Sequence, residues 1–117
     1  MKVRGPAKNS DKPKFGEAQL EAVAELFGVL SEPTRLRILQ LLQDGPATVT
    51  EVVDTLGIKQ ANASKQLGIL YQVGVLGRQK VGLTVRYSIR MPLVFDLCNL
   101  VCGRLKEEAE TRAKSLG

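Results

Sequence analysis

The two cysteines are the residues of this 117-residue chain whose type and spacing could do covalent or metal chemistry. They form the pattern Cys98-x-x-x-Cys102, and a spacing of four puts both sulfurs on one helix face, about one turn apart. Such a pair would suit a soft thiophilic ligand such as arsenite or a Cu(I)-type metal, or oxidation to a persulfide or to a disulfide between protomers. Simple packing as small hydrophobes is the other interpretation, because both share an apolar stripe with Val94, Leu97, Val101 and Leu105.

The chain contains no histidine. This excludes Ser-His and Cys-His nucleophilic arrangements, and it excludes metal sites that depend on imidazole. A cysteine pair on an apolar stripe also lacks a general base. We therefore expect no enzymatic activity, no resident metal and no cofactor.

A second set of chemically suggestive residues lies in the segment 59–90, which holds six Lys or Arg and no acid. The preceding residues 15–58 carry a net charge of −5, so the surface is polarised. Gln60 and Asn62 offer amides that can read adenine, Ala61 offers a methyl for thymine, and Ser64 and Lys65 add polar contacts. Further phosphate contacts are available from Lys59, Arg78, Lys80 and Arg86. A solvated basic face is the alternative, but the arrangement favours double-stranded DNA as the partner.

Four amphipathic helices are predicted before the period of the apolar residues changes. They cover about residues 15–29, the apolar segment after Ser31, the apolar segment after Thr48, and about residues 60–73. Ser31 is expected to cap the second helix, Thr48-x-x-Glu51 forms a capping box for the third, and Gly57 ends it. On the fourth, the residues expected to face inward are Ala63, Leu67 and Leu70, and those expected to face outward are Gln60, Asn62, Lys65 and Gln66.

After Gly74 the period changes from 3.6 to 2. Residues 75–80 and 84–90 therefore predict a hairpin around an 81–83 turn, and Pro92 starts a last helix that carries both cysteines. The order is that of a winged helix-turn-helix, α-α-α-α-β-β-α, mostly α with one β-hairpin. In this motif the fourth helix enters the major groove, and the hairpin follows the backbone or the minor groove.

The domain expected from this pattern spans residues 15–113 and combines DNA binding with dimerisation. Residues 1–14 carry a net charge of +4 with almost no apolar content, which predicts a flexible basic tail. No stretch approaches 18 apolar residues and no signal-peptide core is present, so a cytoplasmic, nucleoid-associated protein with free thiols is expected.

Several segments resemble the ArsR/SmtB family of winged-helix repressors. They are Leu30–Leu39, Leu56–Leu67, Leu70–Leu76 and Val85-Arg86-Tyr87. The resemblance covers about residues 15–105. It implies a homodimer, built from the first and last helices, that binds a palindromic operator and releases it when an effector binds. Recognition-helix contacts in the family fall on the positions of Gln60, Ala61, Asn62, Ser64 and Lys65. One departure is Lys59, where many members carry a capping Ser.

The family's two well-known metal sites lack ligands in this sequence. One uses Cys-x-Cys on the third helix, where this chain reads Glu51-Val52-Val53-Asp54. The other uses Asp and His on the last helix, where this chain has Asp96 but no His. Zinc or nickel sensing by those routes is therefore not expected, and Cys98 and Cys102 are the effector candidates. Two alternatives stay open: a repressor without thiol sensing, and a winged-helix module that binds protein or RNA.

Overall fold

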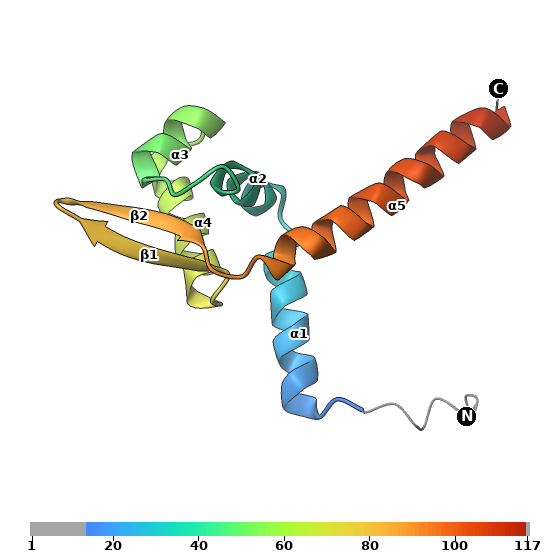
Figure 1. The fold of residues 1–117 in the computed structure, drawn as a ribbon, viewed down its shortest axis with the longest axis horizontal. Coiled ribbons are helices and arrows are strands. Elements are labelled where there is room, and N and C mark those ends of the chain that lie inside the picture. The colour runs from blue at the N-terminus through green and yellow to red at the C-terminus, as the bar shows by residue number, and fades with distance from the viewer. Residues whose placement is uncertain (1–13, 117) are drawn as a thin grey trace.

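The computed structural model describes residues 14–116, which form five helices and one two-stranded sheet (Figure 1). This order confirms the predicted winged helix-turn-helix. The expected tail, residues 1–14, lies outside the described residues except for Lys14. The elements are α1 (Glu17–Val29), α2 (Pro33–Leu42), α3 (Val49–Leu56), α4 (Gln60–Gln72), β1 (Leu76–Val81), β2 (Thr84–Ile89) and α5 (Leu93–Leu116).

The start of α2 differs by one residue from the prediction. Glu32, not Ser31, is the N-cap, because its carboxylate accepts a hydrogen bond from the Arg35 amide at 3.0 Å. Ser31 Oγ donates instead to the carbonyl of Gly28 at 2.6 Å, at the end of α1. A carboxylate satisfies the free amide as a hydroxyl would, and it places negative charge at the positive end of the helix.

Capping also determines how α3 and α4 meet. The predicted capping box is confirmed: Thr48 Oγ1 accepts from the Glu51 amide at 3.1 Å, and Glu51 Oε1 accepts from the Thr48 amide at 2.9 Å. Gly57 ends α3 with φ +68° and donates its amide to the Val53 carbonyl at 2.8 Å. Glycine adopts this left-handed conformation without the penalty that a Cβ would bring. The chain therefore turns sharply and starts α4 three residues later.

The core lies where α2, α3 and α4 meet the base of the hairpin. It is almost wholly aliphatic, and Val94 in the first turn of α5 attaches the base of that helix to it. The inward positions predicted for α4 are confirmed, because all three are fully buried. The buried hydrophobic residues are Val29, Ile38, Leu39, Leu42, Ala47, Val52, Ala63, Leu67, Leu70, Val75, Leu76, Tyr87 and Val94.

The hairpin is held to the helices at its base. β1 and β2 pair antiparallel, and a two-residue tip, Gly82 and Leu83, joins them. Ala47, just before α3, exchanges backbone hydrogen bonds with Tyr87 of β2 at 2.8 and 3.0 Å. This bridge ties the wing to the start of the helix-turn-helix, so the two parts can act together on one surface.

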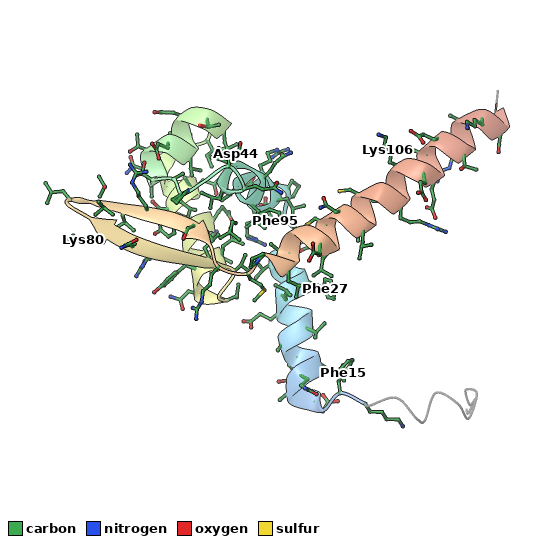
Figure 2. All side chains as sticks on the ribbon, in the orientation of Figure 1. Phe15, Phe27, Asp44, Lys80, Phe95 and Lys106 are labelled. Carbon is green, nitrogen blue, oxygen red and sulfur yellow. The ribbon has the colours of Figure 1, made fainter. Side chains whose placement is uncertain are left out.

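Two helices project from this core in different directions (Figure 1). α1 and all of α5 beyond its first turns point away from the other elements, and most of their apolar residues are exposed in the single chain. Figure 2 shows Phe15 and Phe27 along the α1 side. No helix in the described range is long and apolar enough to cross a membrane. The large exposed apolar residues of these two regions are Phe15, Leu20, Val23, Phe27, Leu93, Leu100, Val101 and Leu105.

Candidate nucleic-acid interface

The N-terminal half of α4 presents a polar surface to solvent. Gln60, Ala61, Ser64 and Lys65 are exposed, whereas Asn62 is partly buried. Lys59 is the N-cap of α4, and its side chain makes no capping hydrogen bond. The bond that a serine would supply at this position is therefore absent. Short polar side chains therefore cover the start of the helix, as insertion into a groove requires.

Gln66 is the predicted outward residue that the structure places inside. Only 8% of it is exposed. Its Oε1 accepts from Arg35 Nη1 at 2.8 Å, and its Nε2 donates to Asn62 Oδ1 at 3.0 Å. Because both ends of the amide are hydrogen-bonded, its burial carries little penalty. The prediction failed because the sequence does not show whether the hydrogen bonds of an amide side chain are made with water or with protein groups.

Arg35 makes a connection to α4 that the sequence did not reveal, since there it is only a cation in an acidic segment. It is partly buried at the start of α2. Its Nε donates to the Val29 carbonyl at 2.6 Å, and its Nη2 lies 3.5 Å from the Gly28 carbonyl. With its third bond to Gln66, Arg35 joins the end of α1 to the middle of α4. No local pattern reveals a contact between residues 31 positions apart.

The strand register separates the wing cations onto two faces. Arg78 pairs across the strands with Tyr87, and Lys80 with Val85, whereas Arg86 pairs with Gln79. Directly paired residues share a face and successive residues alternate. Arg78 and Lys80 therefore lie on one face and Arg86 on the other.

Arg78 is ordered against aromatic side chains. Its guanidinium lies 4.1 Å from the centre of the Tyr71 ring, which belongs to α4. The hydrogen bond with the Tyr87 side chain is the main cause that raises the pKa of Arg78, and Tyr71 raises this pKa further. Arg78 therefore stays charged. The contact joins β1 of the wing to the C-terminal end of α4.

Arg86 lies against α3 instead. Its Nη1 is 3.6 Å from Glu51 Oε1, the same carboxylate that completes the capping box. In contrast, Lys59, Lys65 and Lys80 take part in no ion pair within residues 14–116. The predicted phosphate contacts thus comprise three unpaired lysines and two arginines already held by intramolecular partners.

Both cysteines lie on the first half of α5 as free thiols, Cys98 partly buried and Cys102 exposed. Burial raises the pKa of Cys98, and the neighbouring Cys102 raises it further, in keeping with two sulfurs on one helix face. Within the described range, His, Cys, Asp and Glu form no group of three or more that could hold a metal ion. The structure brings the two thiols together without adding a third ligand.

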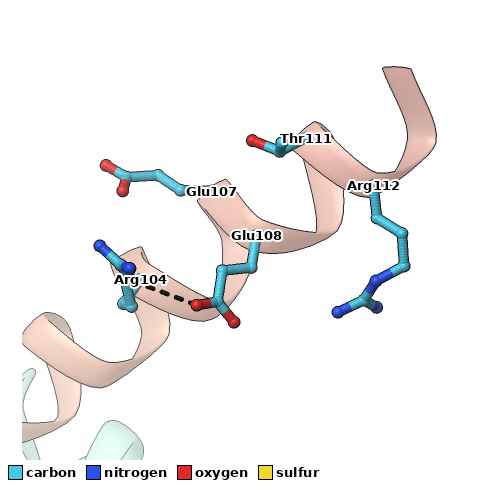
Figure 3. A pocket seen from close by; sticks show the side chains of 5 residues that line it. All are labelled: Arg104, Glu107, Glu108, Thr111 and Arg112. Atoms are coloured by element: carbon cyan, nitrogen blue, oxygen red, sulfur yellow. Dashed lines mark hydrogen bonds and ion pairs between the residues drawn. The ribbon is translucent and has the colours of Figure 1, made fainter. Parts of the chain in front are cut away.

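A shallow hollow on the distal half of α5 contains neither the cysteines nor the candidate DNA-binding residues (Figure 3). One helix supplies all of its lining residues, and Arg104 Nε donates to Glu108 Oε2 at 3.2 Å across it. A surface with no opposing wall buries little of a ligand, so it is no candidate site.

Comparison with known proteins agrees with this geometry. Residues 30–77 match a helix-turn-helix domain family. A probable mercury resistance operon repressor of Streptomyces lividans is 32% identical over 105 residues, which cover 79% of this chain and 84% of the relative. The homodimeric winged helix-turn-helix DNA-binding domain of Mb0332 from Mycobacterium bovis, described as a possible ArsR-family regulator, superposes with a TM-score of 0.70. It is 27% identical, over 82% of this chain and 92% of that one.

The chain belongs to the ArsR/SmtB family. The crystal structure of AntR, an antimony-specific transcriptional repressor, is also similar, with a TM-score of 0.72 and 31% identity over 94% of this chain and 99% of that one. Because these relatives are transcriptional regulators, this ArsR/SmtB member is a transcriptional repressor and not an enzyme.

Proposed function

We propose that this ArsR/SmtB protein is a homodimeric repressor that binds a palindromic operator through α4 and the β1–β2 wing. The observation that carries the proposal is the acid-free segment 59–90, which includes the exposed start of α4 and the wing. Arg78 of the wing lies on Tyr71 near the C-terminal end of α4, so this contact joins the wing to that helix. The exposed residues of this segment would form a DNA-binding surface that suits the phosphates on both sides of a groove.

The residues of this surface divide into two roles. The short side chains at the start of α4 face base edges: Gln60, Asn62 and Ser64 through polar groups and Ala61 through its methyl. The cations contact phosphates and hold the protein in register: Lys59, Lys65, Arg78, Lys80 and Arg86. Arg86 reaches a phosphate only by giving up its ion pair with Glu51.

Dimerisation through α1 and α5 follows from their exposed apolar faces. A monomer rarely leaves this much apolar surface in water. The Mb0332 domain is a homodimer, which supports the same assembly for this chain. Two protomers related by a twofold axis would place two α4 helices in successive major grooves, and an operator read this way is palindromic.

The test is a titration of DNA from upstream of the gene by fluorescence anisotropy, with an unrelated duplex as competitor. With 6–10 phosphate contacts per dimer, affinity should fall roughly 10³–10⁵-fold between about 50 and 200 mM salt. Lys65→Gln should flatten this salt dependence. Lys106→Gln, which removes the same charge on the distal part of α5 (Figure 2), should leave it unchanged. A flat salt response, or equal binding to both duplexes, would contradict the proposal and favour a protein- or RNA-interaction module.

We further propose that Cys98 and Cys102 form the effector site. Two relatives are named for mercury and antimony, which are thiophilic elements, and this chain places two thiols on one helix face. With arsenite, each thiol would give its proton to a hydroxide of arsenous acid, which leaves as water as the As–S bond forms. Bridging two turns of α5 at the dimer surface would then alter the assembly that binds DNA.

Arsenite and mild oxidant should therefore release the reduced protein from its operator in the same assay. The double variant Cys98→Ser/Cys102→Ser should bind DNA as tightly as the unmodified protein does, and neither treatment should release it. Cys102→Ser alone should lose the response to arsenite, because one thiol cannot chelate. If the unmodified protein binds DNA equally well after treatment, the cysteines only pack and the signal lies elsewhere.

A further inference from the structure

We propose that Arg35 and Gln66 are positioning residues that determine which end of the Asn62 amide faces DNA. The inference rests on the proposed role of α4 as the recognition helix. It adds that Asn62 is presented as a hydrogen-bond donor, with Nδ2 outward. The evidence is a chain of three side chains joined by two hydrogen bonds, Arg35 to Gln66 and Gln66 to Asn62.

The polarity of this chain follows from the chemistry of its first member. A guanidinium can only donate hydrogen bonds, so Gln66 must turn its Oε1 toward Arg35, where the distance is 2.8 Å. Gln66 then has only its NH₂ group left for Asn62. Asn62 must accept with its Oδ1, which lies 3.0 Å from Gln66 Nε2. One arginine thus fixes the orientation of two successive amides.

Burial makes this orientation durable. Gln66 is almost fully buried, and Asn62 and Arg35 are partly buried. Rotating either amide by half a turn would bring two donors together in a poorly solvated place, which leaves a buried polar group unsatisfied. Arg35 is itself anchored by the Val29 carbonyl at the end of α1, at 2.6 Å.

The consequence concerns which base edges α4 can read at this position. A bidentate pair with adenine uses both the oxygen and the nitrogen of one amide. Here the bond from Gln66 holds Asn62 Oδ1 toward the protein, and the NH₂ group is the end left for DNA. Asn62 therefore donates to an acceptor, such as guanine O6 or N7, thymine O4, adenine N7 or a phosphate oxygen, and does not form the bidentate pair with adenine expected from residue type alone.

Gln66→Glu tests the orientation of the Asn62 amide, because it replaces the donor that faces Asn62 by an acceptor with almost no change in side-chain shape. A carboxylate still accepts from Arg35, but toward Asn62 it can also only accept. The Asn62 amide must then turn its NH₂ inward and its Oδ1 outward. Binding to operators carrying every single-base change should show one contacted position in each half-site where the base preference changes by roughly tenfold. The preference should move from guanine or thymine, which offer acceptors but no donor in the major groove, to adenine or cytosine, which offer a donor.

Gln72→Glu is the matched control, because it places the same new charge at the exposed end of α4. It should leave base preference unchanged and cause at most a uniform weakening of binding to all operators, because the new charge only adds to the overall repulsion of DNA. If Gln66→Glu gives only this uniform weakening, with base preference unchanged, the inference is wrong.

Side-chain amide NMR supplies a readout that needs no DNA. The Nδ2 protons of Asn62 should exchange quickly with water in the natural protein and slowly in Gln66→Glu, while circular dichroism checks that both are folded. Protected Nδ2 protons in the natural protein would overturn the inference. Failure to bind any operator would instead refute the proposed function, and the exchange data would still decide the amide orientation.

Discussion

At the scale of single residues, the two thiols differ although they are one helical turn apart. Cys98 is partly buried and Cys102 is exposed. Burial is the main cause that raises the Cys98 pKa, and Cys102 contributes as well. Because the thiolate is the reactive form, a raised pKa lowers the reactivity of Cys98 at neutral pH.

Alkylation should reveal this difference as a function of pH. Carbamidomethylation of Cys98, followed by mass spectrometry between about pH 7 and 10, should reach its half-maximal rate at a higher pH than an unstructured peptide with the same residues. Cys102→Ser should move that midpoint down part of the way, since only the effect of burial is left. A Cys98 midpoint below that of the peptide would contradict the environment described for this thiol.

Gly57 carries a second prediction at this scale. Its φ of +68° is costly for a residue with a Cβ, although a Cβ there would meet no atom within 4 Å. Gly57→Ala should therefore destabilise the fold by about 1–2 kcal/mol through the backbone alone. Gly68→Ala is the control: the space is equally open but the backbone is helical, so stability should rise by about 0.5–1 kcal/mol. Urea unfolding measures both, and equal effects would refute the argument.

At the scale of elements, one carboxylate connects α3 with the wing. Glu51 completes the capping box of α3 and lies 3.6 Å from Arg86 of β2. These two functions respond differently to loss of charge, because a glutamine can cap in the same geometry but cannot form an ion pair. The wing cation could then turn to a phosphate without competition.

Glu51→Gln should accordingly change stability by less than about 1 kcal/mol, as expected for an exposed ion pair. Affinity for DNA should rise at low salt, and its dependence on salt should become steeper because Arg86 is released. Glu108→Gln breaks the Arg104–Glu108 ion pair on α5 and should leave DNA binding unchanged. An unaltered salt dependence in Glu51→Gln would mean that Arg86 does not contact phosphate.

At the scale of the whole molecule, folding and the proposed assembly use different residues. The core draws on α2, α3, α4, the hairpin, the last residue of α1 and the first turn of α5. The exposed apolar residues are concentrated on the α1 side and along α5. Assembly can therefore be disturbed without unfolding the protomer.

Leu100→Glu is the test, because this α5 residue is 73% exposed in the single chain and lies away from the core. A charge buried at a dimer surface is costly, so sedimentation should show a folded monomer with greatly weakened operator binding. Leu83→Glu adds the same charge at the wing tip, where the side chain is 99% exposed, and should stay dimeric. A dimeric Leu100→Glu would remove this part of α5 from the proposed interface.

The elements could be predicted from the order of residues because their causes are local. Helical periodicity, the Thr48-x-x-Glu51 box and Gly57 act within a few positions, and the fold class followed from them. The shift of the α2 cap from Ser31 to Glu32 is the kind of one-residue error that such signals allow. The candidate DNA surface could likewise be located from the distribution of charge along the chain, because the segment 59–90 contains no acid.

Tertiary structure alone decided how the side chains of that surface are held. The strand register placed Arg86 on the opposite face of the hairpin from Arg78 and Lys80. Packing of α2 on α4 buried Gln66 against Arg35, 31 residues away, and so turned the Asn62 amide. Local sequence determines which helices and strands form, because their hydrogen bonds and apolar periods span a few residues. The direction in which a polar side chain points depends on partners that only the folded chain brings within bonding distance.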